Sequence, residues 1–248
     1  AAVREYNQKL DGAVVDALEI GRQQIQDAYR MVPPPLLSAL RLSAARISKF
    51  QKKTLPTGWM DPEEGLGIRV IPLERVGLYA PGGTAAYPST VLMTAIPARV
   101  AGVKEIVLCS PAAGGRLFSP AVLVAADIAQ VDRVFQVGGV QAIGAMAFGT
   151  ESIPRVDKIC GPGNIFVSLA KRAVFGQVDI DGTYGPTETL VIADENANPA
   201  LCAADLLAQA EHDPLSCPVL VATSRAWVSR VLEEMDRQLP TLPRRETA

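Results

Sequence analysis

Hydrophobic positions recur at two different spacings along this 248-residue chain, and the spacing changes near residue 70. In the first fifty residues they stand three or four apart, which predicts amphipathic helices. One stripe consists of Val15, Leu18, Ile25 and Tyr29; a second, after a run of three prolines, consists of Leu36, Leu40, Ala44, Ile47 and Phe50. We therefore expect two amphipathic helices ahead of the rest of the fold.

Beyond a turn-rich stretch at 56–67, short runs rich in β-branched residues alternate with helical runs. Each run is closed by Gly, Pro, Asn or Asp, which interrupt regular structure. The predicted strands are Val76–Tyr79, Glu105–Cys109, Arg133–Val137, Val156–Ile159, Thr189–Ala193 and Pro218–Ala222. This alternation indicates an α/β fold of mostly parallel sheets with helices on both faces, and ligands of such folds bind beyond the carboxyl ends of the strands.

Several helix ends are marked by their residue types. Ser119-Pro120 and Asn198-Pro199 each place a capping side chain before a proline suited to the first helical position. Gly102 is placed to end the helix that begins near Pro88. These signals predict where three of the crossover helices begin or end.

Three glycine-containing loops follow predicted strands and open helices, at 80–84, 137–141 and 161–164. Such loops expose backbone N–H groups at a helix start, where anions bind. Each alone is equally typical of an ordinary tight turn, and the GxGxxG fingerprint is absent. Three in one domain favour nucleotide binding. Asn164, in the third loop, is placed either to cap the next helix or to offer its amide to a ligand.

His212 is the only histidine of the chain, and it follows Gln209 by three residues at the end of the helical run 199–211. That spacing puts both side chains on one helix face, where an amide oxygen and an imidazole nitrogen are suitable metal ligands. A surface pair near a helix end explains the same residues, and zinc needs three or four ligands. Thr187 and Glu188 enter the preceding strand, either as a polar strand entry or as part of the same crevice.

The composition excludes several classes of protein. Hydrophobic residues make up 48% and charged residues 20% of the chain, as in ordinary globular proteins. The 24 basic and 26 acidic side chains nearly cancel, and no basic block predicts nucleic acid as a partner. No apolar run has the length of a membrane span or a secretory signal. Four scattered cysteines without CxxC spacing favour buried free thiols in a reducing compartment, and we expect a cytoplasmic location.

The chain resembles the histidinol dehydrogenase family in five segments that occur in the family's order. These are RVGLYAPGG (75–83), STVLMTAIPARVAGV (89–103), VGGVQAIGAMAFGT (137–150), VDKICGPGN (156–164) and DLLAQAEHDP (205–214). The resemblance implies two Rossmann-like domains, one inserted in the other, and a homodimer built with small carboxyl-terminal domains. Residues 79–188 would be the inserted NAD-binding domain, and 1–78 with 189–248 an incomplete outer domain.

The resemblance also implies an activity. Members of the family oxidise L-histidinol to L-histidine through L-histidinal, passing hydrides to two NAD molecules in the last step of histidine biosynthesis. The family's cofactor contacts correspond to Tyr79, Gln141 and Asn164. Its substrate contacts correspond to Thr187, where many members carry Ser, and to Gln209 and His212, and the last two also correspond to ligands of Zn²⁺.

The family's Glu-His catalytic pair and its remaining zinc ligands, an Asp and a His, correspond to positions beyond Ala248. Oxidation of an alcohol needs a base, and the only histidine here is already the proposed metal ligand. We therefore expect a fragment, shortened at both ends and inactive alone. Two alternatives stay open: a non-catalytic nucleotide-binding module, and a related dehydrogenase for another small alcohol.

Overall fold

The computed structural model describes residues 2–12, 14–15, 17–82, 87–112, 118–184 and 188–247. It divides into two compact units, Ala1–Tyr184 and Gly185–Ala248. The predictions for Thr187 and for the end of the 80–84 loop lie outside the described residues. The division into an outer domain and an inserted one at residues 79 and 188 stays a prediction.

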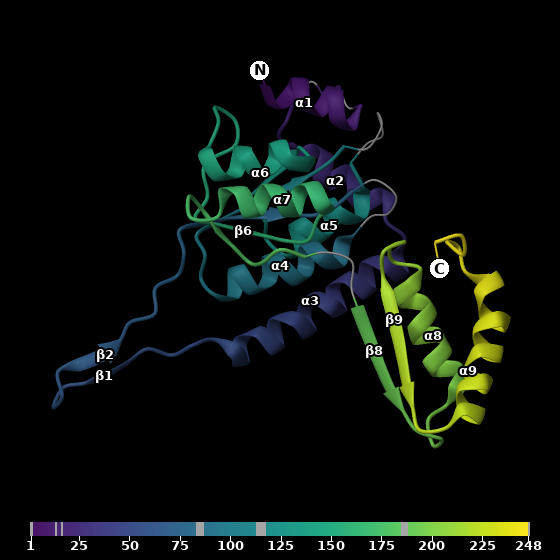
Figure 1. The fold of residues 1–248 in the computed structure, drawn as a ribbon. Coiled ribbons are helices and arrows are strands. Elements are labelled where there is room, and N and C mark those ends of the chain that lie inside the picture. Colours follow the sequence, from purple (N-terminus) through teal and green to yellow (C-terminus); the bar gives the residue numbers. More distant parts are fainter. Residues whose placement is uncertain are drawn as a thin grey trace. The chain divides into compact units, whose positions relative to one another are not determined.

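The first unit is built on a five-stranded parallel sheet. Its strands are β3 (Arg75–Tyr79), β4 (Glu105–Ser110), β5 (Arg133–Gln136), β6 (Lys158–Cys160) and β7 (Asp179–Ile180), in the spatial order β5-β4-β3-β6-β7 (Figure 1). The order reverses between β3 and β6, as in Rossmann-like folds. The predicted α/β class is confirmed, and four of these five strands were predicted from the sequence.

Helices cover both faces of this sheet (Figure 1). On one face lie α4 (Pro88–Val100) and α5 (Pro120–Ile128), packed in turn by α2 (Arg22–Met31) and α3 (Pro34–Thr54). On the other lie α6 (Gly139–Phe148) and α7 (Ile165–Val174). Successive strand residues point to opposite faces, so Leu78 joins the first cluster and Tyr79 the second. The sheet therefore separates two apolar cores.

The prediction of one continuous helix before α3 is wrong. The segment forms α1 (Ala2–Asp11) and α2, and the described residues between them are not helical. Gly12 has a φ of +62°, which ends α1, and Gly21 precedes α2. Between them Glu19 forms an antiparallel bridge with Phe135 of β5. Leu18 is consequently buried against the α6 and α7 side, whereas Ile25 packs on the opposite side.

Most of the predicted helix ends are observed. The side-chain oxygen of Asn198 accepts the N–H of Ala200 at 2.9 Å and caps the helix that follows. Gly102 lies just beyond α4 with a φ of +83°. Ser119 precedes Pro120 as expected, but its side chain makes no capping hydrogen bond. The position of that helix start was therefore predicted correctly and its capping contact was not.

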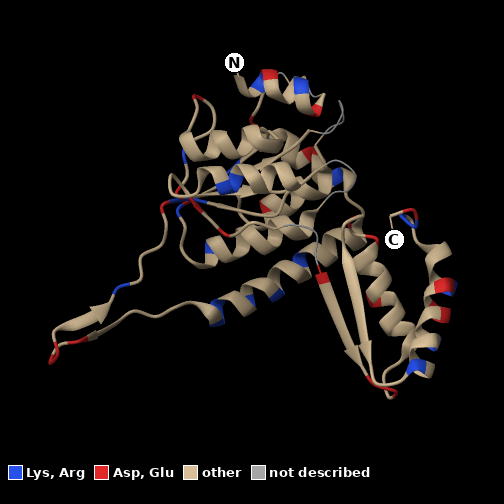
Figure 2. Ribbon diagram, in the orientation of Figure 1, with Lys and Arg blue, Asp and Glu red and all other residues tan. Residues whose placement is uncertain are grey.

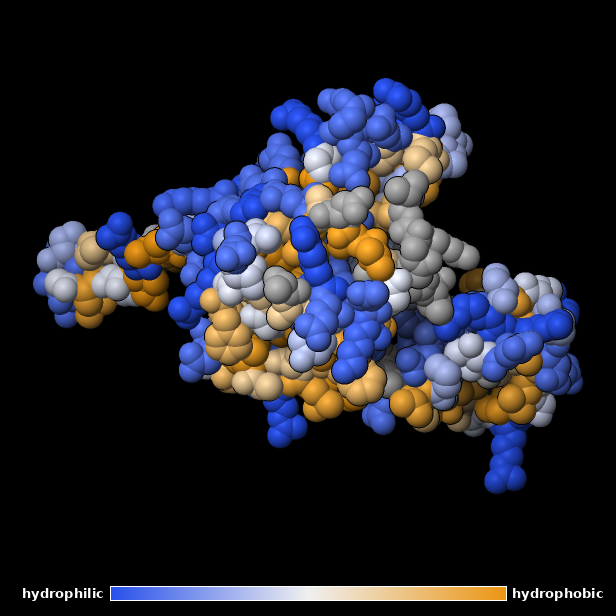
Figure 3. Space-filling view, turned by 90° about the horizontal axis from the view of Figure 1, so that it is seen from above, coloured by the Kyte–Doolittle hydropathy of each residue, from blue (hydrophilic) through white to orange (hydrophobic). Residues whose placement is uncertain are grey.

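A small antiparallel hairpin occupies the stretch that the sequence analysis assigned to turns. It consists of β1 (Trp59–Asp61) and β2 (Leu66–Ile68). Its apolar side chains Trp59, Met60, Leu66 and Ile68 are all at least half exposed. The hairpin projects at the left of Figure 1, and the corresponding left end of Figure 3 shows hydrophobic and hydrophilic surface side by side. The three-residue strands are too short to give a clear alternating pattern, which is why they were missed.

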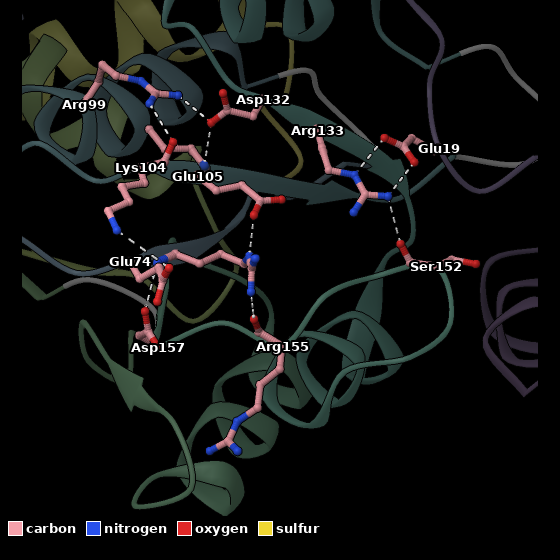
Figure 4. A network of polar contacts seen from close by, with 12 residues as sticks. Glu19, Glu74, Arg99, Lys104, Glu105, Asp132, Arg133, Ser152, Arg155 and Asp157 are labelled. Carbon is pink, nitrogen blue, oxygen red and sulfur yellow. Dashed lines mark hydrogen bonds and ion pairs between the residues drawn. The ribbon is translucent and has the colours of Figure 1, made fainter.

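Ion pairs and hydrogen bonds between charged side chains connect the amino-terminal ends of the strands (Figures 2 and 4). The Nε of Arg75 on β3 lies 2.6 Å from Glu105 of β4. The Asp132 carboxylate, just before β5, accepts both Arg99 and the backbone N–H of Ile106. These contacts fix the register of β3, β4 and β5, and they lie at the edge opposite to the predicted ligand-binding edge.

The second unit is a parallel pair of strands packed on two helices. β8 (Glu188–Ala193) and β9 (Cys217–Ala222) are joined by α8 (Pro199–Ala210), and α9 (Arg225–Gln238) runs into a short 3₁₀ helix, η1 (Leu239–Thr241). Ala203, Leu206, Trp227 and Val231 form its buried core. The other face of the strand pair is bare: Leu190, Ile192, Val219 and Val221 are 43% to 75% exposed.

Two further expectations concern thiols and membrane spans. Cys109, Cys160, Cys202 and Cys217 are all free thiols, as predicted; the expectation that they are buried holds for Cys109 and Cys202 but is wrong for Cys217, which is exposed on β9. Within the described ranges, no helix combines the length and the apolar character that a bilayer crossing requires.

Candidate functional site

The carboxyl-terminal edge of the first unit's sheet brings together residues from three loops. The strand order reverses between β3 and β6, and such a reversal opens a ligand-binding crevice in parallel sheets. Tyr79 ends β3, and Gly161 follows β6 beside it. Gly161 has a φ of +118°, and a Cβ there would stand 2.0 Å from the Tyr79 carbonyl oxygen. Only glycine allows the two strand ends to approach this closely.

The Tyr79 side chain connects β3 to the start of α6. Its hydroxyl oxygen accepts the backbone N–H of Gly139 at 3.1 Å, and the ring is only 4% exposed. Burial raises the pKa of Tyr79 to about 12, and the nearby Asp11 carboxylate adds to the rise. The phenol therefore keeps its proton at neutral pH. The first residue of α6 is thus tied directly to the end of β3.

Gln141, one turn into α6, has a buried side chain held by α1. Its Nε2 donates to Asn7 Oδ1 at 3.2 Å and to Asp11 Oδ2 at 3.0 Å. Its Oε1 is buried and has no hydrogen-bond partner among the described residues. Burial also raises the pKa of Asp11, and the hydrogen bond from Gln141 partly offsets that rise. The edge therefore contains one desolvated amide oxygen that is ready to accept a hydrogen bond.

Asn164 begins α7 and caps it. Its Oδ1 accepts the N–H of Val167 at 3.0 Å, so the capping role, one of the two alternatives for this residue, is confirmed. The cap uses the side-chain oxygen, and the amide nitrogen takes no part in it. The two N–H groups of the Asn164 side chain are therefore not used by the cap.

A buried lysine holds the loop that leads to Asn164. Lys171 of α7 is 1% exposed; its Nζ donates to the Gly161 carbonyl oxygen at 3.0 Å and forms an ion pair with Asp181. The other Asp181 oxygen accepts the Gly161 N–H at 2.7 Å, and the Lys171 ammonium lies 5.0 Å from the centre of the Tyr184 ring. Both backbone polar groups of Gly161 are thereby fixed.

In the second unit, Gln209 and His212 lie at the carboxyl end of α8. Gln209 is half-buried within the helix, and His212 is exposed just beyond its last residue, Ala210. The His212 N–H donates to the Gln209 carbonyl oxygen at 3.2 Å, so the helical turn continues through this point. His212 thus lies one turn after Gln209 but beyond the end of α8, and a shared ligand role of their side chains stays a prediction.

Two hollows of the first unit lie away from these residues. One, of about 310 Å³, is lined by residues of 155–157 and 175–179. The other, of about 670 Å³, lies between the 55–73 segment and α4, and Cys160 lines it as well. Tyr79, Gln141 and Asn164 line neither, so the candidate site is defined by its polar groups and loops rather than by a deep cavity.

Comparison with known proteins identifies the family. The sequence model of histidinol dehydrogenase matches residues 1–248. The chain belongs to the histidinol dehydrogenase family. It is 53% identical over 247 residues to the histidinol dehydrogenase of Dehalococcoides mccartyi strain CBDB1, covering 99% of this chain and 56% of that protein. It is 51% identical to that of Aquifex aeolicus, covering 100% of this chain and 58% of that protein.

Solved structures agree with this assignment. The crystal structure of histidinol dehydrogenase from Elizabethkingia anophelis superposes with a TM-score of 0.92 at 38% identity, covering 99% of this chain and 58% of that chain. An acetylating aldehyde dehydrogenase from Geobacillus thermoglucosidasius shares the fold alone, with a TM-score of 0.51 at 15% identity. The chain thus spans somewhat more than half the length of the histidinol dehydrogenases it matches.

The carboxyl edge fits a dinucleotide in its chemistry. A dinucleotide carries hydroxyl and amide donors, and the buried Gln141 oxygen is an acceptor without a donor among the described residues. Gly138 and Gly139 open α6 without side chains, and a Cβ on Gly138 would stand 2.4 Å from Pro111. Glycine at position 138 therefore allows the start of α6 to pack closely against Pro111.

The end of α8 fits a zinc ion only in part. An amide oxygen and an imidazole nitrogen are suitable ligands, but zinc needs three or four. The neighbouring carboxylates are already engaged: Glu211 accepts the Arg244 N–H at 2.7 Å, and Asp213 accepts the Leu215 N–H at 2.9 Å. The part of the chain that the structure describes contains no cluster of three His, Cys, Asp or Glu side chains suited to a metal.

The sequence analysis missed Asn7, Asp11, Lys171 and Asp181. Asn7 and Asp11 carry no local signal, because they act on a residue some 130 positions away. Lys171 does carry one: it stands four residues after Val167 and three before Val174, within the buried stripe of α7. A charge inside an apolar stripe predicts a buried ion pair.

Proposed function

We propose that the protein acts as a zinc-dependent histidinol dehydrogenase. It would oxidise L-histidinol to L-histidine through L-histidinal, with NAD as the hydride acceptor, in the last step of histidine biosynthesis. The family match over residues 1–248 carries this proposal. The unpartnered Gln141 oxygen, at the edge where a parallel sheet binds its ligands, supports its cofactor part.

Tyr79, Gln141 and Asn164 are the proposed cofactor contacts. The Tyr79 phenol is protonated and offers an O–H donor, because its oxygen already accepts Gly139. Gln141 offers an acceptor through Oε1, and Asn164 a donor through Nδ2. Bound NAD supplies the acceptor for the hydride, and the chain supplies position and hydrogen bonds.

Gln209 and His212 are the proposed zinc ligands from this chain, and with Thr187 the proposed substrate contacts. A zinc ion held there would supply a positive charge that orients the imidazole and amine of the substrate. His212 must be neutral to ligate, which leaves the chain without a histidine for proton transfer. We therefore propose that the general base and the other ligands come from a part of the protein outside this segment.

The architecture of the whole protein follows as part of the same proposal. We propose that residues 1–78 and 189–248 belong to an outer Rossmann-like domain and 79–188 to an inserted NAD-binding domain. Parallel strands are normally covered on both faces, and one face of β8 and β9 is exposed. This exposure supports the proposal that a further part of the protein packs on that face. A homodimer and a cytoplasmic location belong to the proposal as well.

One assay tests the function directly. NADH formation is followed at 340 nm with L-histidinol, NAD and zinc, for this 248-residue chain and for the protein from the complete reading frame. We expect turnover only in the longer protein. Turnover in neither would contradict the proposal and favour a non-catalytic or altered-substrate protein. Turnover in the short chain would contradict the assignment of the base to another segment.

A further inference from the structure

The amide of Gln141 is held in a single orientation by two side chains of α1. Its Nε2 group has two hydrogens, and both are used, one on Asn7 Oδ1 and one on Asp11 Oδ2. A carboxylate only accepts hydrogen bonds, so the nitrogen of the amide has to face Asp11. The oxygen of the amide must then point the other way.

The amide oxygen of Gln141, Oε1, is buried and has no hydrogen-bond partner in the described chain. Gln141 is 8% exposed, and its Oε1 lies over the first residue of α6, 2.8 Å from where a Cβ of Gly139 would stand. A buried carbonyl oxygen without a donor is unfavourable, because it has lost its hydrogen bonds to water. An arrangement that keeps this oxygen unpaired in the free protein is ready for a donor on a ligand.

Helix α1 is itself anchored at the same edge of the sheet. Asn7 is 1% exposed, and its Nδ2 donates to the carbonyl oxygen of Gln136, the last residue of β5, at 2.8 Å. The Asp11 carboxylate lies close to Gly138, 3.1 Å from where a Cβ of that residue would stand. Asn7 thus locates α1 beside α6 (Figure 1), and Asp11 adds a negative charge near the start of α6.

We propose that Asp11, together with Asn7, is a positioning residue that turns the Gln141 oxygen toward a hydrogen-bond donor of the bound dinucleotide. The inference rests on the proposed function. The donor is an uncharged group, the carboxamide N–H₂ or a ribose hydroxyl, because the Asp11 carboxylate repels a phosphate at this place. The pyrophosphate therefore binds elsewhere along the edge.

Equilibrium binding of NAD and of ADP-ribose to the protein from the complete reading frame tests this role. Asp11→Ala is expected to raise the Kd for NAD about tenfold, because Gln141 can then rotate and lose its orientation. Asp11→Asn is expected to raise it less, roughly threefold, because an Asn side chain can still accept from Nε2 in one of its orientations. Glu5→Ala, which removes an exposed carboxylate from the same helix, is the matched control.

The two ligands identify the donor. A loss for NAD alone assigns it to the nicotinamide half, and an equal loss for both assigns it to the ADP-ribose half; either result supports the positioning role. Asp11 variants that keep the wild-type circular dichroism and the wild-type Kd for both ligands would overturn it. A wild-type protein that binds neither ligand would instead overturn the proposed function itself.

Discussion

Lys171 and Asp181 hold Gly161 between them through both of its backbone polar groups. The lysine donates to the Gly161 carbonyl oxygen, and the aspartate accepts the Gly161 N–H. The pair is largely buried, with side-chain exposures of 2% and 20%. Because Gly161 opens the loop that ends at Asn164, this ion pair sets the position of one of the proposed cofactor contacts.

Lys171→Met is expected to lower the free energy of unfolding by about 3 kcal/mol, because it leaves the Asp181 carboxylate without its cation. Urea unfolding measures the change. Lys104→Met is the matched control, since Lys104 pairs with Glu74 at 3.8 Å with both side chains more than 70% exposed. That control should change stability by less than about 0.5 kcal/mol. Equal changes in the free energy of unfolding would show that the buried ion pair stabilises the protein no more than the exposed one.

Gly161→Ala should destabilise the protein more than Gly176→Ala. Both glycines have a positive φ, +118° and +94°, so both substitutions introduce backbone strain of about 1 kcal/mol. Only at Gly161 does the new Cβ meet another backbone, that of Tyr79, whereas nothing lies within 4 Å at Gly176. Unfolding curves and the Kd for NAD measure both effects. Similar losses at the two positions would contradict the close approach of β3 and β6.

Alkaline pH should destabilise the protein through Cys109. This thiol is fully buried, and burial raises its pKa from 9.0 to about 12. Above pH 9 the unfolded chain loses the thiol proton while the folded protein keeps it, so stability falls as pH rises toward 12. The contribution is about 1.4 kcal/mol per pH unit. In Cys109→Ala the slope between pH 9 and 10.5 should be shallower by up to this amount, as measured by urea unfolding at several pH values, and an unchanged slope would contradict the prediction.

Zinc binding by the protein from the complete reading frame should depend on the end of α8. Gln209→Ala and His212→Ala are each expected to remove stoichiometric zinc after dialysis, as measured by plasma mass spectrometry, because each deletes a proposed ligand. Asp205→Asn, at an exposed position of the same helix, should retain zinc. Full zinc content in both ligand variants would rule out this pair as the metal site.

The bare face of β8 and β9 should make the 248-residue chain self-associate. Ile192 and Val221 stand directly opposite one another and are 75% and 49% exposed. A sheet with exposed apolar side chains and unpaired edge strands tends to associate with a second copy of the chain. Sedimentation velocity at micromolar concentration should find less association in Ile192→Thr/Val221→Thr than in the wild type. Leu201→Thr, which removes a 66% exposed side chain from α8, should have little effect.

Local patterns predicted the strands well because buried parallel strands are short, β-branched and bounded by turn residues. The predicted run Thr189–Ala193 differs from β8 by one residue, and Pro218–Ala222 from β9 by one residue. The break between α1 and α2 was not predicted, because Leu18 and Ile25 match a helical spacing although they face opposite sides of the sheet. A periodicity does not reveal which core a residue enters.

Local patterns predicted three strand-to-helix loops, whereas the family resemblance assigned Tyr79, Gln141 and Asn164 in or beside them to the cofactor. The structure places these three residues at the carboxyl edge of the sheet, and their role stays a prediction. The groups that position them were not found, because Asp11 and Asp181 sit in turns or helix ends whose sequence is equally compatible with simple solvent exposure. Their roles arise only from the tertiary fold.

The hydrogen bonds of Asn7 join residues 129 and 134 positions apart. Helix α1 is therefore synthesised long before its docking surface on β5 and α6 exists. At roughly 5–20 residues per second, the interval is on the order of ten seconds. During that time a ten-residue helix is marginal in water, so its folding awaits the sheet. The amino-terminal helix that positions Gln141 at the proposed cofactor site therefore cannot dock before α6 has left the ribosome.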